Sequence, residues 1–330
     1  MSSPARSRWI IAGVLLVAIA VAWWIRRPQQ TATVAYVADR AATLWSTTAE
    51  VRHAVATLGY GERVMVTTRS GDQAQVRTDD GAQGWLDSRM LMDAPMWQRV
   101  SDLLNRAKAM PVQAAGHTRA LSNVHMEPAR DASRIFQFGR DVPVAVLQRK
   151  AVAAPQAGGE TGDNAAAQNQ DNPKQEDWLL VLGTGDTPIA GWVLARFIDL
   201  DPPQPIPDYT SAAGMRVVAW AVLNTVPDAT GAKPQYLVAG VRGGEGQPCD
   251  FTMLRVYTWD GPRQRYETAF IDSDLCGALP IRVSQVGDET EFRFAEIDED
   301  GAQRAYRMKQ TAVRRVRQAG SDRTSAAARP

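Results

Sequence analysis

The residues that could carry out covalent chemistry are few and lie far apart in the chain. Its 330 residues include three histidines, His53, His117 and His125, and two cysteines, Cys249 and Cys276. Catalysis by a thiol needs a histidine within hydrogen-bond reach of the cysteine, and here both cysteines follow the last histidine by a long stretch of chain. A zinc site needs several histidine or carboxylate ligands, and no His-Glu-x-x-His motif is present. We predict no catalytic residue, no metal site and no cofactor.

Two short segments resemble ligand loops but are better explained as turns. Residues 298–301 carry alternating acidic side chains before a glycine, as calcium loops do, but residues 302–305 supply too few oxygen ligands. Residues 183–186 lack the third glycine and the following helix of a phosphate loop. We predict a turn between strands at both places.

The two cysteines are placed to pair with each other. Residues 249–259 and 265–271 have the composition of strands, and Asp260-Gly261-Pro262 is a turn signal between them. Folding that hairpin places Cys249 opposite residue 274, within two residues of Cys276. We predict a Cys249–Cys276 disulfide, which indicates an oxidising compartment. The alternative is two free buried thiols.

Aromatic side chains are the remaining candidates for ligand binding. Trp45, Tyr60 and Trp178 lie beside polar or glycine-rich segments, where a ring can stack on a peptide or glycan. Packing at the edge of a core is the alternative for each. Trp85 and Trp192 are predicted to be structural, because a large ring is an effective core for a small domain.

The last two tryptophans belong to an internal repeat. Residues 84–91 and 191–198 both read Gly-Trp-aliphatic-x-x-Arg-apolar-apolar. Upstream, Leu44-Trp45 in the first copy corresponds to Val124-His125 in the second, and the spacing to the Gly-Trp pair is 27 residues longer in the second copy. Residues 148–177 are polar and contain few large apolar side chains, so we predict that they form a disordered insertion.

The elements that must position these residues are mainly strands. Short β-type runs punctuated by glycine predict a small barrel over residues 32–93 and a second over 117–200. Helical spacing of apolar residues predicts a linking helix over 94–112, with Asp93 as a possible N-cap. Residues 201–207 are a proline-rich linker, 208–318 an antiparallel meander or sandwich of about seven strands, and 319–330 a disordered tail.

The first copy resembles a bacterial SH3 (SH3b) domain. The resemblance rests on Leu44-Trp45, on the central segment 58–64, and on Gly84-Trp85-Leu86 followed by Arg89-Met90-Leu91. The second copy is similar but departs through its insertion and Val142-Pro143. The resemblance implies barrels of five to seven strands in extracytoplasmic proteins, often bound to cell-wall peptides or used for targeting. The Cys-His peptidases that accompany such domains carry the cysteine before the histidine, an order that this chain lacks.

Residues 9–25 have the features of a membrane anchor. They contain no charge, have arginines on both sides, and carry Trp9 at one end and Trp23-Trp24 at the other. At 1.5 Å per residue they span about 25 Å, near the lower limit for crossing a bilayer. The alternative is a cleaved signal peptide, because residues 20–22 have the small-x-small form. A net charge of +1 argues against a nucleic-acid partner.

Together these features predict a single-pass protein of the bacterial inner (cytoplasmic) membrane, with its C-terminal part in the periplasm or cell exterior. Its tandem SH3-like domains would bind cell-wall peptide or glycan, or an envelope protein. A second hypothesis is an envelope assembly or scaffold component with no small ligand. A third is an uncharacterised enzyme in the C-terminal domain.

Overall fold

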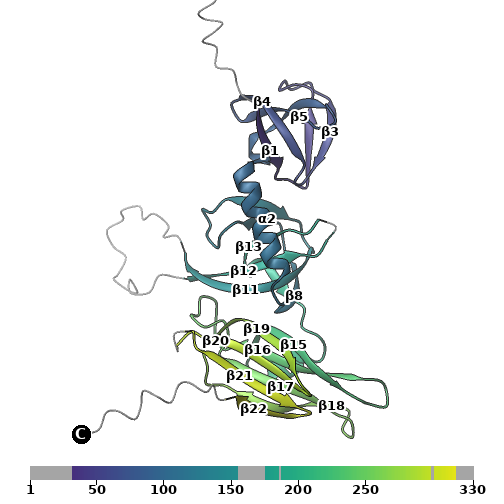
Figure 1. Cartoon of the computed structure of the whole chain (residues 1–330), viewed down its shortest axis with the longest axis vertical. Coiled ribbons are helices and arrows are strands. Elements are labelled where there is room, and N and C mark those ends of the chain that lie inside the picture. The colour runs from purple at the N-terminus through teal and green to yellow at the C-terminus, as the bar shows by residue number, and fades with distance from the viewer. Residues whose placement is uncertain (1–31, 155–174, 186, 299–300, 317–330) are drawn as a thin grey trace, which may run out of the picture. The chain divides into compact units, whose positions relative to one another are not determined.

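The computed structural model describes residues 32–154, 175–185, 187–298 and 301–316 (Figure 1). The predicted anchor at 9–25 and the predicted tail at 319–330 lie outside these residues. Within the described part of the chain, no helix is both long enough and apolar enough to cross a membrane. The chain divides into two compact units after Ala94. The protein is mainly β, with antiparallel sheets, as predicted.

The first unit contains the first repeat, which is one seven-stranded sheet. Its strands are β1 (Thr33–Val37), β2 (Ala41–Trp45), β3 (Ala54–Gly59), β4 (Arg63–Ser70), β5 (Gln73–Thr78), β6 (Gln83–Asp87) and β7 (Leu91–Asp93). They are hydrogen-bonded in the order β3-β2-β6-β5-β4-β1-β7. Inward-facing positions alternate along each strand, and Leu44, Val64, Val76 and Leu86 are among the buried residues that form the core.

The second repeat has the same connectivity. Its strands are β8 (Ala114–Thr118), β9 (Ser122–His125), β10 (Arg134–Phe138), β11 (Pro143–Ala153), β12 (Gln175–Gly183), β13 (Ala190–Leu194) and β14 (Ile198–Leu200). Their order, β10-β9-β13-β12-β11-β8-β14, matches the first repeat strand for strand. Each repeat also has a short 3-10 turn before its last strand. The duplication seen in the sequence is therefore a duplication of topology.

The strands of the second repeat extend into the predicted insertion, so its bounds of 148–177 were wrong. Residues 148–153 continue β11, and 175–177 begin β12, with Gln148 opposite Leu180 and Ala153 opposite Gln175. The polar composition that indicated disorder includes Arg149 and Asp177, which are buried and paired with each other. The remaining residues, 155–174, lie outside the described part of the chain.

Two α-helices lie between the strands in the described part of the chain. Helix α2 (Ala94–Lys108) lies in the segment predicted as a linking helix, 94–112, but ends at Lys108, and it buries Val100, Leu103 and Ala107. Arg99 on this helix forms an ion pair with Glu127 of the second repeat at 3.6 Å. Helix α3 (Ile206–Ala212) begins inside the segment predicted as the extended linker 201–207. Its buried Ile206 packs in an aromatic cluster on the following sheet, which explains why the proline-rich segment turns into a helix.

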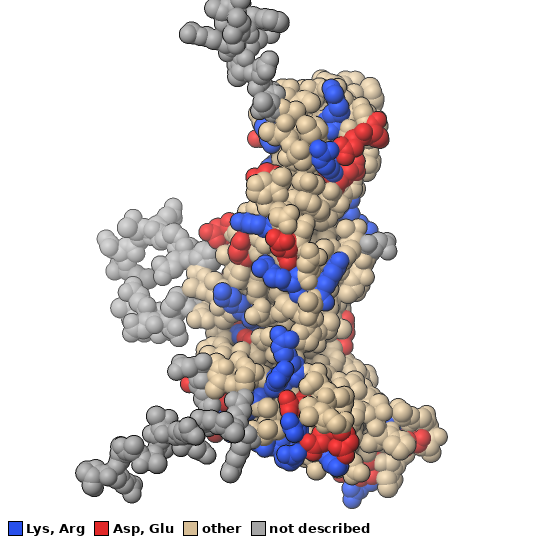
Figure 2. Space-filling view, in the orientation of Figure 1, with Lys and Arg blue, Asp and Glu red and all other residues tan. Residues whose placement is uncertain are grey.

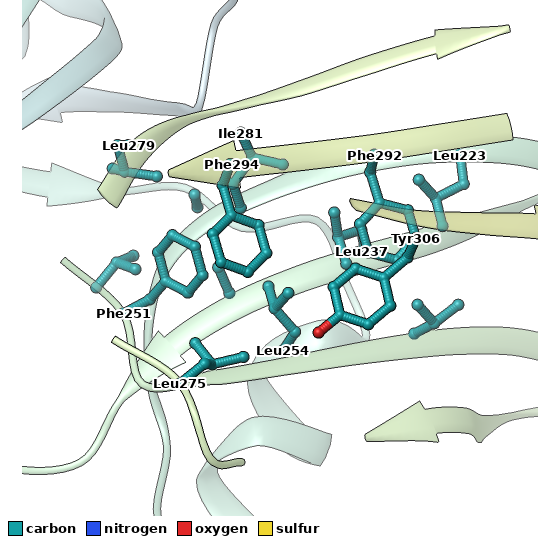
Figure 3. Close-up of a cluster of buried hydrophobic side chains, with 14 of the residues drawn as sticks. Leu223, Leu237, Phe251, Leu254, Leu275, Leu279, Ile281, Phe292, Phe294 and Tyr306 are labelled. Atoms are coloured by element: carbon teal, nitrogen blue, oxygen red, sulfur yellow. The ribbon is translucent and has the colours of Figure 1, made fainter. Parts of the chain in front are cut away.

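The C-terminal part is a double sheet of eight strands. One sheet contains β15 (Arg216–Val226), β16 (Lys233–Val241), β17 (Met253–Asp260) and β18 (Arg265–Asp272) in chain order. The other contains β19 (Gly277–Val286), β20 (Glu289–Glu296), β21 (Gln303–Lys309) and β22 (Ala312–Val316). The sequence predicts this meander of hairpins but not β22. The core between the sheets is built largely from Phe251, Phe292, Phe294, Tyr306 and aliphatic residues (Figure 3).

Candidate functional site

A pair of tryptophans from neighbouring strands shares one face of the first repeat. Trp45 at the end of β2 lies directly opposite Trp85 of β6. Residues opposite each other in an antiparallel pair project to the same side of the sheet. Both rings are only partly buried, so this face presents aromatic surface to solvent. The equivalent pair in the second repeat is His125 and Trp192.

This arrangement corrects the core role expected for Trp85 and Trp192. Gly84 and Leu86 are buried on either side of Trp85, and Gly191 and Val193 are buried on either side of Trp192. Because side chains alternate along a strand, each tryptophan faces away from the core that its neighbours enter. The alternation of side chains along these two strands is the signal in the sequence from which the outward placement of Trp85 and Trp192 follows.

A loop beside Trp45 adds a cation and apolar surface. The Arg52 guanidinium carbon lies 4.4 Å from the centroid of the Trp45 ring. Val51 and Val55 are exposed, at 92% and 41%. The base of the loop is held by the backbone of Ser46, which donates to the His53 carbonyl at 3.0 Å. We refer to Trp45, Val51, Arg52, Val55 and Trp85 as the Trp45 surface.

The other two aromatic candidates do not join this surface. Tyr60 follows the far end of β3, where Gly59 lies opposite Ala41, whereas Trp45 lies opposite Ala54. At about 3.3 Å per residue, the two ends of that hairpin are roughly 16 Å apart. Burial raises the pKa of Tyr60 to about 12. The structure therefore does not bring Trp45 and Tyr60 into one groove.

Trp178 belongs to the core of the second repeat. It is 2% exposed, and its ring meets that of His125 edge to face at a centroid distance of 5.3 Å. His125 is held further by a contact of 2.9 Å between Nδ1 and the Ala132 carbonyl oxygen. A buried ring cannot stack on a ligand in solution, so Trp178 does not take the binding role proposed for it from the sequence.

The arginine that follows Gly-Trp at the same spacing in both copies has a local structural role. Arg89 binds both carboxylate oxygens of Asp87, and this pairing lowers the pKa of Asp87 to about 2. Arg196 binds Glu176 at 3.1 Å, and Arg130 binds the same carboxylate. These hydrogen bonds hold the turn before the last strand of each repeat and leave neither arginine as an unpaired cation.

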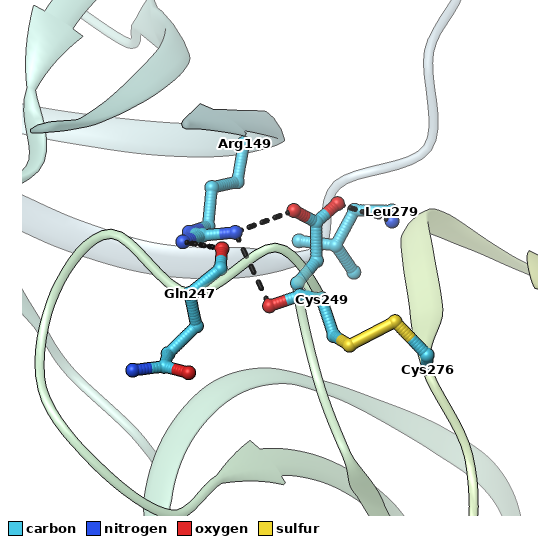
Figure 4. Close-up of a disulfide and its surroundings, with 6 residues drawn as sticks. Arg149, Gln247, Cys249, Cys276 and Leu279 are labelled. Carbon is cyan, nitrogen blue, oxygen red and sulfur yellow. Dashed lines mark hydrogen bonds and ion pairs between the residues drawn. A yellow bond between two sulfur atoms is a disulfide. The ribbon is translucent and has the colours of Figure 1, made fainter. Parts of the chain in front are cut away.

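The two cysteines form the predicted disulfide (Figure 4). Asp298 is the one acidic residue grouped with Cys249 and Cys276 as a potential metal ligand among the described residues. A disulfide sulfur has no thiolate to bind a metal or to act as a nucleophile. In the disulfide-bonded form, neither cysteine can bind a metal as a thiolate or act as a nucleophile.

A buried ionic cluster lies next to the disulfide and joins the second repeat to the double sheet. Arg149 of β11 donates to Asp177 at 2.6 Å and to Asp250 at 2.8 Å. It also donates to the carbonyls of Gln247 and Cys249 (Figure 4). Burial raises the pKa of Asp250, while the Leu279 N–H and Arg149 oppose that rise. Every charged member has a partner, so the cluster has the properties of a structural clamp.

A shallow hollow of about 310 Å³ lies beside this clamp. Its lining combines polar and apolar side chains from both parts, namely Gln148, Arg149, Lys150, Ala151, Gln175, Pro248, Asp250, Ala278, Leu279 and Ile297. Lys150, one of these lining residues, is exposed. No histidine or free thiol is among these lining residues, so the hollow lacks the groups used for acid-base or nucleophilic catalysis by those residues.

Charge on the visible surface is mixed in sign. Figure 2 shows basic and acidic side chains interspersed, with no continuous basic stripe on this face. Many arginines in the structure are paired with carboxylates, including Arg63 with Asp79 and Arg119 with Asp199. Such a distribution lacks the electrostatic footprint of a nucleic-acid interface on this face.

Comparison with known proteins identifies no family. No family model and no curated protein matches the chain. Among solved structures, the chain is similar to an NlpC/P60 family protein from Bacillus cereus, with 14% identity and a TM-score of 0.23. That match covers 55% of this chain and 62% of the other. NlpC2 from Trichomonas vaginalis matches with 10% identity and a TM-score of 0.18, over 88% of this chain and 98% of that one. TM-scores this low support no functional inference.

Proposed function

We propose that the protein is a membrane-anchored, extracytoplasmic binding protein whose tandem SH3-like barrels bind cell-wall peptide or glycan, or an envelope protein. In this proposal, residues 9–25 cross the bacterial inner membrane once, and the repeats and the double sheet are in the periplasm or cell exterior. The Cys249–Cys276 disulfide supports an oxidising compartment. The protein is not an enzyme in this proposal.

The observation that carries the proposal is the Trp45 surface. Two partly exposed indole rings lie opposite each other, and an arginine covers one of them. Exposed aromatic rings on a rigid sheet bind extended ligands by stacking, at a small cost in side-chain entropy. Arg52 can move aside and bind a carboxylate or hydroxyl of the ligand, because no acidic partner of Arg52 is present among the described residues.

The test compares variants of the Trp45 surface in a pull-down on isolated peptidoglycan. Trp45→Ala and Trp85→Ala should each weaken binding by about 1 to 3 kcal/mol, as expected for aromatic anchors. Arg52→Ala should weaken it with no loss of core packing. Gln83→Ala is the matched control, because Gln83 is exposed on the same face of β6, two residues before Trp85. Leu86→Ala should instead unfold the repeat, at a cost of about 2 to 5 kcal/mol.

Circular dichroism on each variant separates lost binding from lost structure. Unchanged peptidoglycan binding in folded Trp45→Ala and Trp85→Ala would contradict the proposal. An envelope assembly component with no small ligand would then be the better description. The exposed edge of the double sheet at β19 favours that second function, because free strand edges are sites of protein association.

A further inference from the structure

Strand β19 presents an open edge over its second half. It is the first strand of its sheet, and β20 is its sheet neighbour. Residues 282–286 are all exposed, including Val283 at 36% and Val286 at 37%. An exposed row of backbone N–H and C=O groups is a template for a further strand.

The chain itself already uses the beginning of this edge. The side chain of Gln113 accepts from the Ile281 N–H at 2.7 Å and donates to the Ile281 carbonyl at 3.1 Å. Gln113 therefore occupies the position of a neighbouring strand at Ile281 alone. Hydrogen-bonding direction alternates along a strand, so the N–H and C=O groups of Val283 and Gln285 point to the same open side as those of Ile281.

Two arginines mark the outer face next to this edge. Arg282 of β19 lies directly opposite Arg293 of β20, and both are exposed. Like charges in directly opposite positions destabilise a sheet. Four other basic side chains of this sheet are paired: Arg304 with Glu296, Arg307 with Glu291, Arg314 with Glu289, and Lys309 with Asp288. Among the described residues, Arg282 and Arg293 have no acidic partner.

We propose that the edge of β19 binds an extended acidic segment of a partner protein as an added strand. The segment pairs with the free backbone groups of Val283 and Gln285. A carboxylate of the segment that falls on the outer face lies beside Arg282 and Arg293 and relieves their repulsion. Alternate, apolar residues of the segment contact Val283 on the other face. Main-chain bonds then supply affinity, and the arginine pair supplies specificity.

The arginine pair also argues against a second copy of this chain as the occupant. Pairing two β19 edges antiparallel would bring two such arginine pairs to the same small sheet face. That assembly gathers four unpaired cations, whereas an acidic strand neutralises two. The charge pattern therefore selects an acidic partner.

Two labelled nine-residue peptides serve as probes, one alternating aspartate and valine and the other alternating lysine and valine. The aspartate peptide should bind the full chain, measured by fluorescence anisotropy, and the lysine peptide should bind at least tenfold more weakly. Saturation with the aspartate peptide should slow amide exchange at Val283 and Gln285. The double variant Arg282→Glu, Arg293→Glu should reverse the preference between the peptides.

Val283→Pro should abolish binding, because it removes an outward N–H that the sheet does not use. Arg69→Glu is the matched control for charge reversal, since Arg69 is exposed in the first repeat and has no acidic partner among the described residues. Melting temperatures check that each variant is folded. The proposal would be overturned if the aspartate peptide left amide exchange at Val283 and Gln285 unchanged. It would also be overturned if the folded double variant bound that peptide as tightly as the wild-type chain does. Neither result depends on the Trp45 surface.

Discussion

The glycine of each Gly-Trp pair is explained by a close approach between strands. A Cβ on Gly84 would lie 2.6 Å from the Trp45 carbonyl oxygen and 2.7 Å from Leu44 Cγ. A Cβ on Gly191 would collide with Val124 and lie 2.9 Å from the His125 carbonyl oxygen. The strand that carries the tryptophan can therefore approach its neighbour this closely only at a residue without a side chain, which is glycine. The same close approach explains the glycine of the Gly-Trp motif in both repeats.

Gly84→Ala should destabilise the first repeat by about 1 to 3 kcal/mol, because backbone and a buried leucine must move to admit the methyl group. Gly59→Ala is the matched control: no atom lies within 4 Å of the position that a Cβ would take there, and the change should be within about 0.5 kcal/mol of neutral. Denaturant unfolding of the full chain carrying each substitution measures both effects. Equal stability of the two variants would refute the close-approach explanation.

At the level of elements, one residue joins three strands. The Gln113 N–H donates to the Val146 carbonyl at 2.8 Å, and the Gln113 carbonyl accepts from the Trp220 N–H at 2.8 Å. Its side chain binds both backbone groups of Ile281. Gln113 therefore links β11 of the second repeat to β15 and β19, one strand from each sheet of the C-terminal part. Arg149 forms the second link, through Asp250.

Gln113→Ala should lower the free energy of unfolding of the second unit by about 1 to 3 kcal/mol, because the buried Ile281 N–H and C=O lose their partners. Gln137→Ala provides the comparison. Gln137 is exposed and binds one side chain, Asn123, so its loss should change stability by less than about 0.5 kcal/mol. Urea titrations followed by tryptophan fluorescence report both values. A Gln113 variant as stable as the Gln137 variant would show that the link is dispensable.

At the scale of the whole molecule, the first repeat is one compact unit, and the second repeat belongs to the other unit with α2 and the double sheet. The two sequence copies thus have different structural roles. The first retains a partly exposed tryptophan pair. The second has a histidine in place of one tryptophan, holds that histidine against Trp178, and packs β11 near β19 of the double sheet.

Calorimetry should resolve two transitions, one for each unit. The disulfide lies in the second unit and joins cysteines 27 residues apart, for which chain entropy gives a stabilisation of about 3.5 kcal/mol. Replacing both cysteines by serine should therefore lower the second melting temperature and leave the first unchanged. Labelling of unreduced, denatured wild-type protein should find no free thiol. A shift in both transitions would mean that the two units unfold together.

The sequence by itself determined the features that depend on local pattern. Alternation and turn residues located most strands, the Gly-Trp motif showed the duplication, and hairpin register placed Cys249 near Cys276. These features follow from contacts between residues that are close in the chain or related by a single hairpin.

The tertiary structure decided which side chains face solvent and which distant segments meet. Trp178 is buried and Trp85 is partly exposed, the reverse of what their surroundings in the sequence suggested. Arg149 and Asp177 lie in a segment whose polarity indicated disorder, yet they are buried because they pair with each other and with groups far along the chain. Arg149 donates to Asp250, and Asp177 accepts from the Gly246 N–H. Such placement depends on long-range packing, which composition and periodicity do not encode.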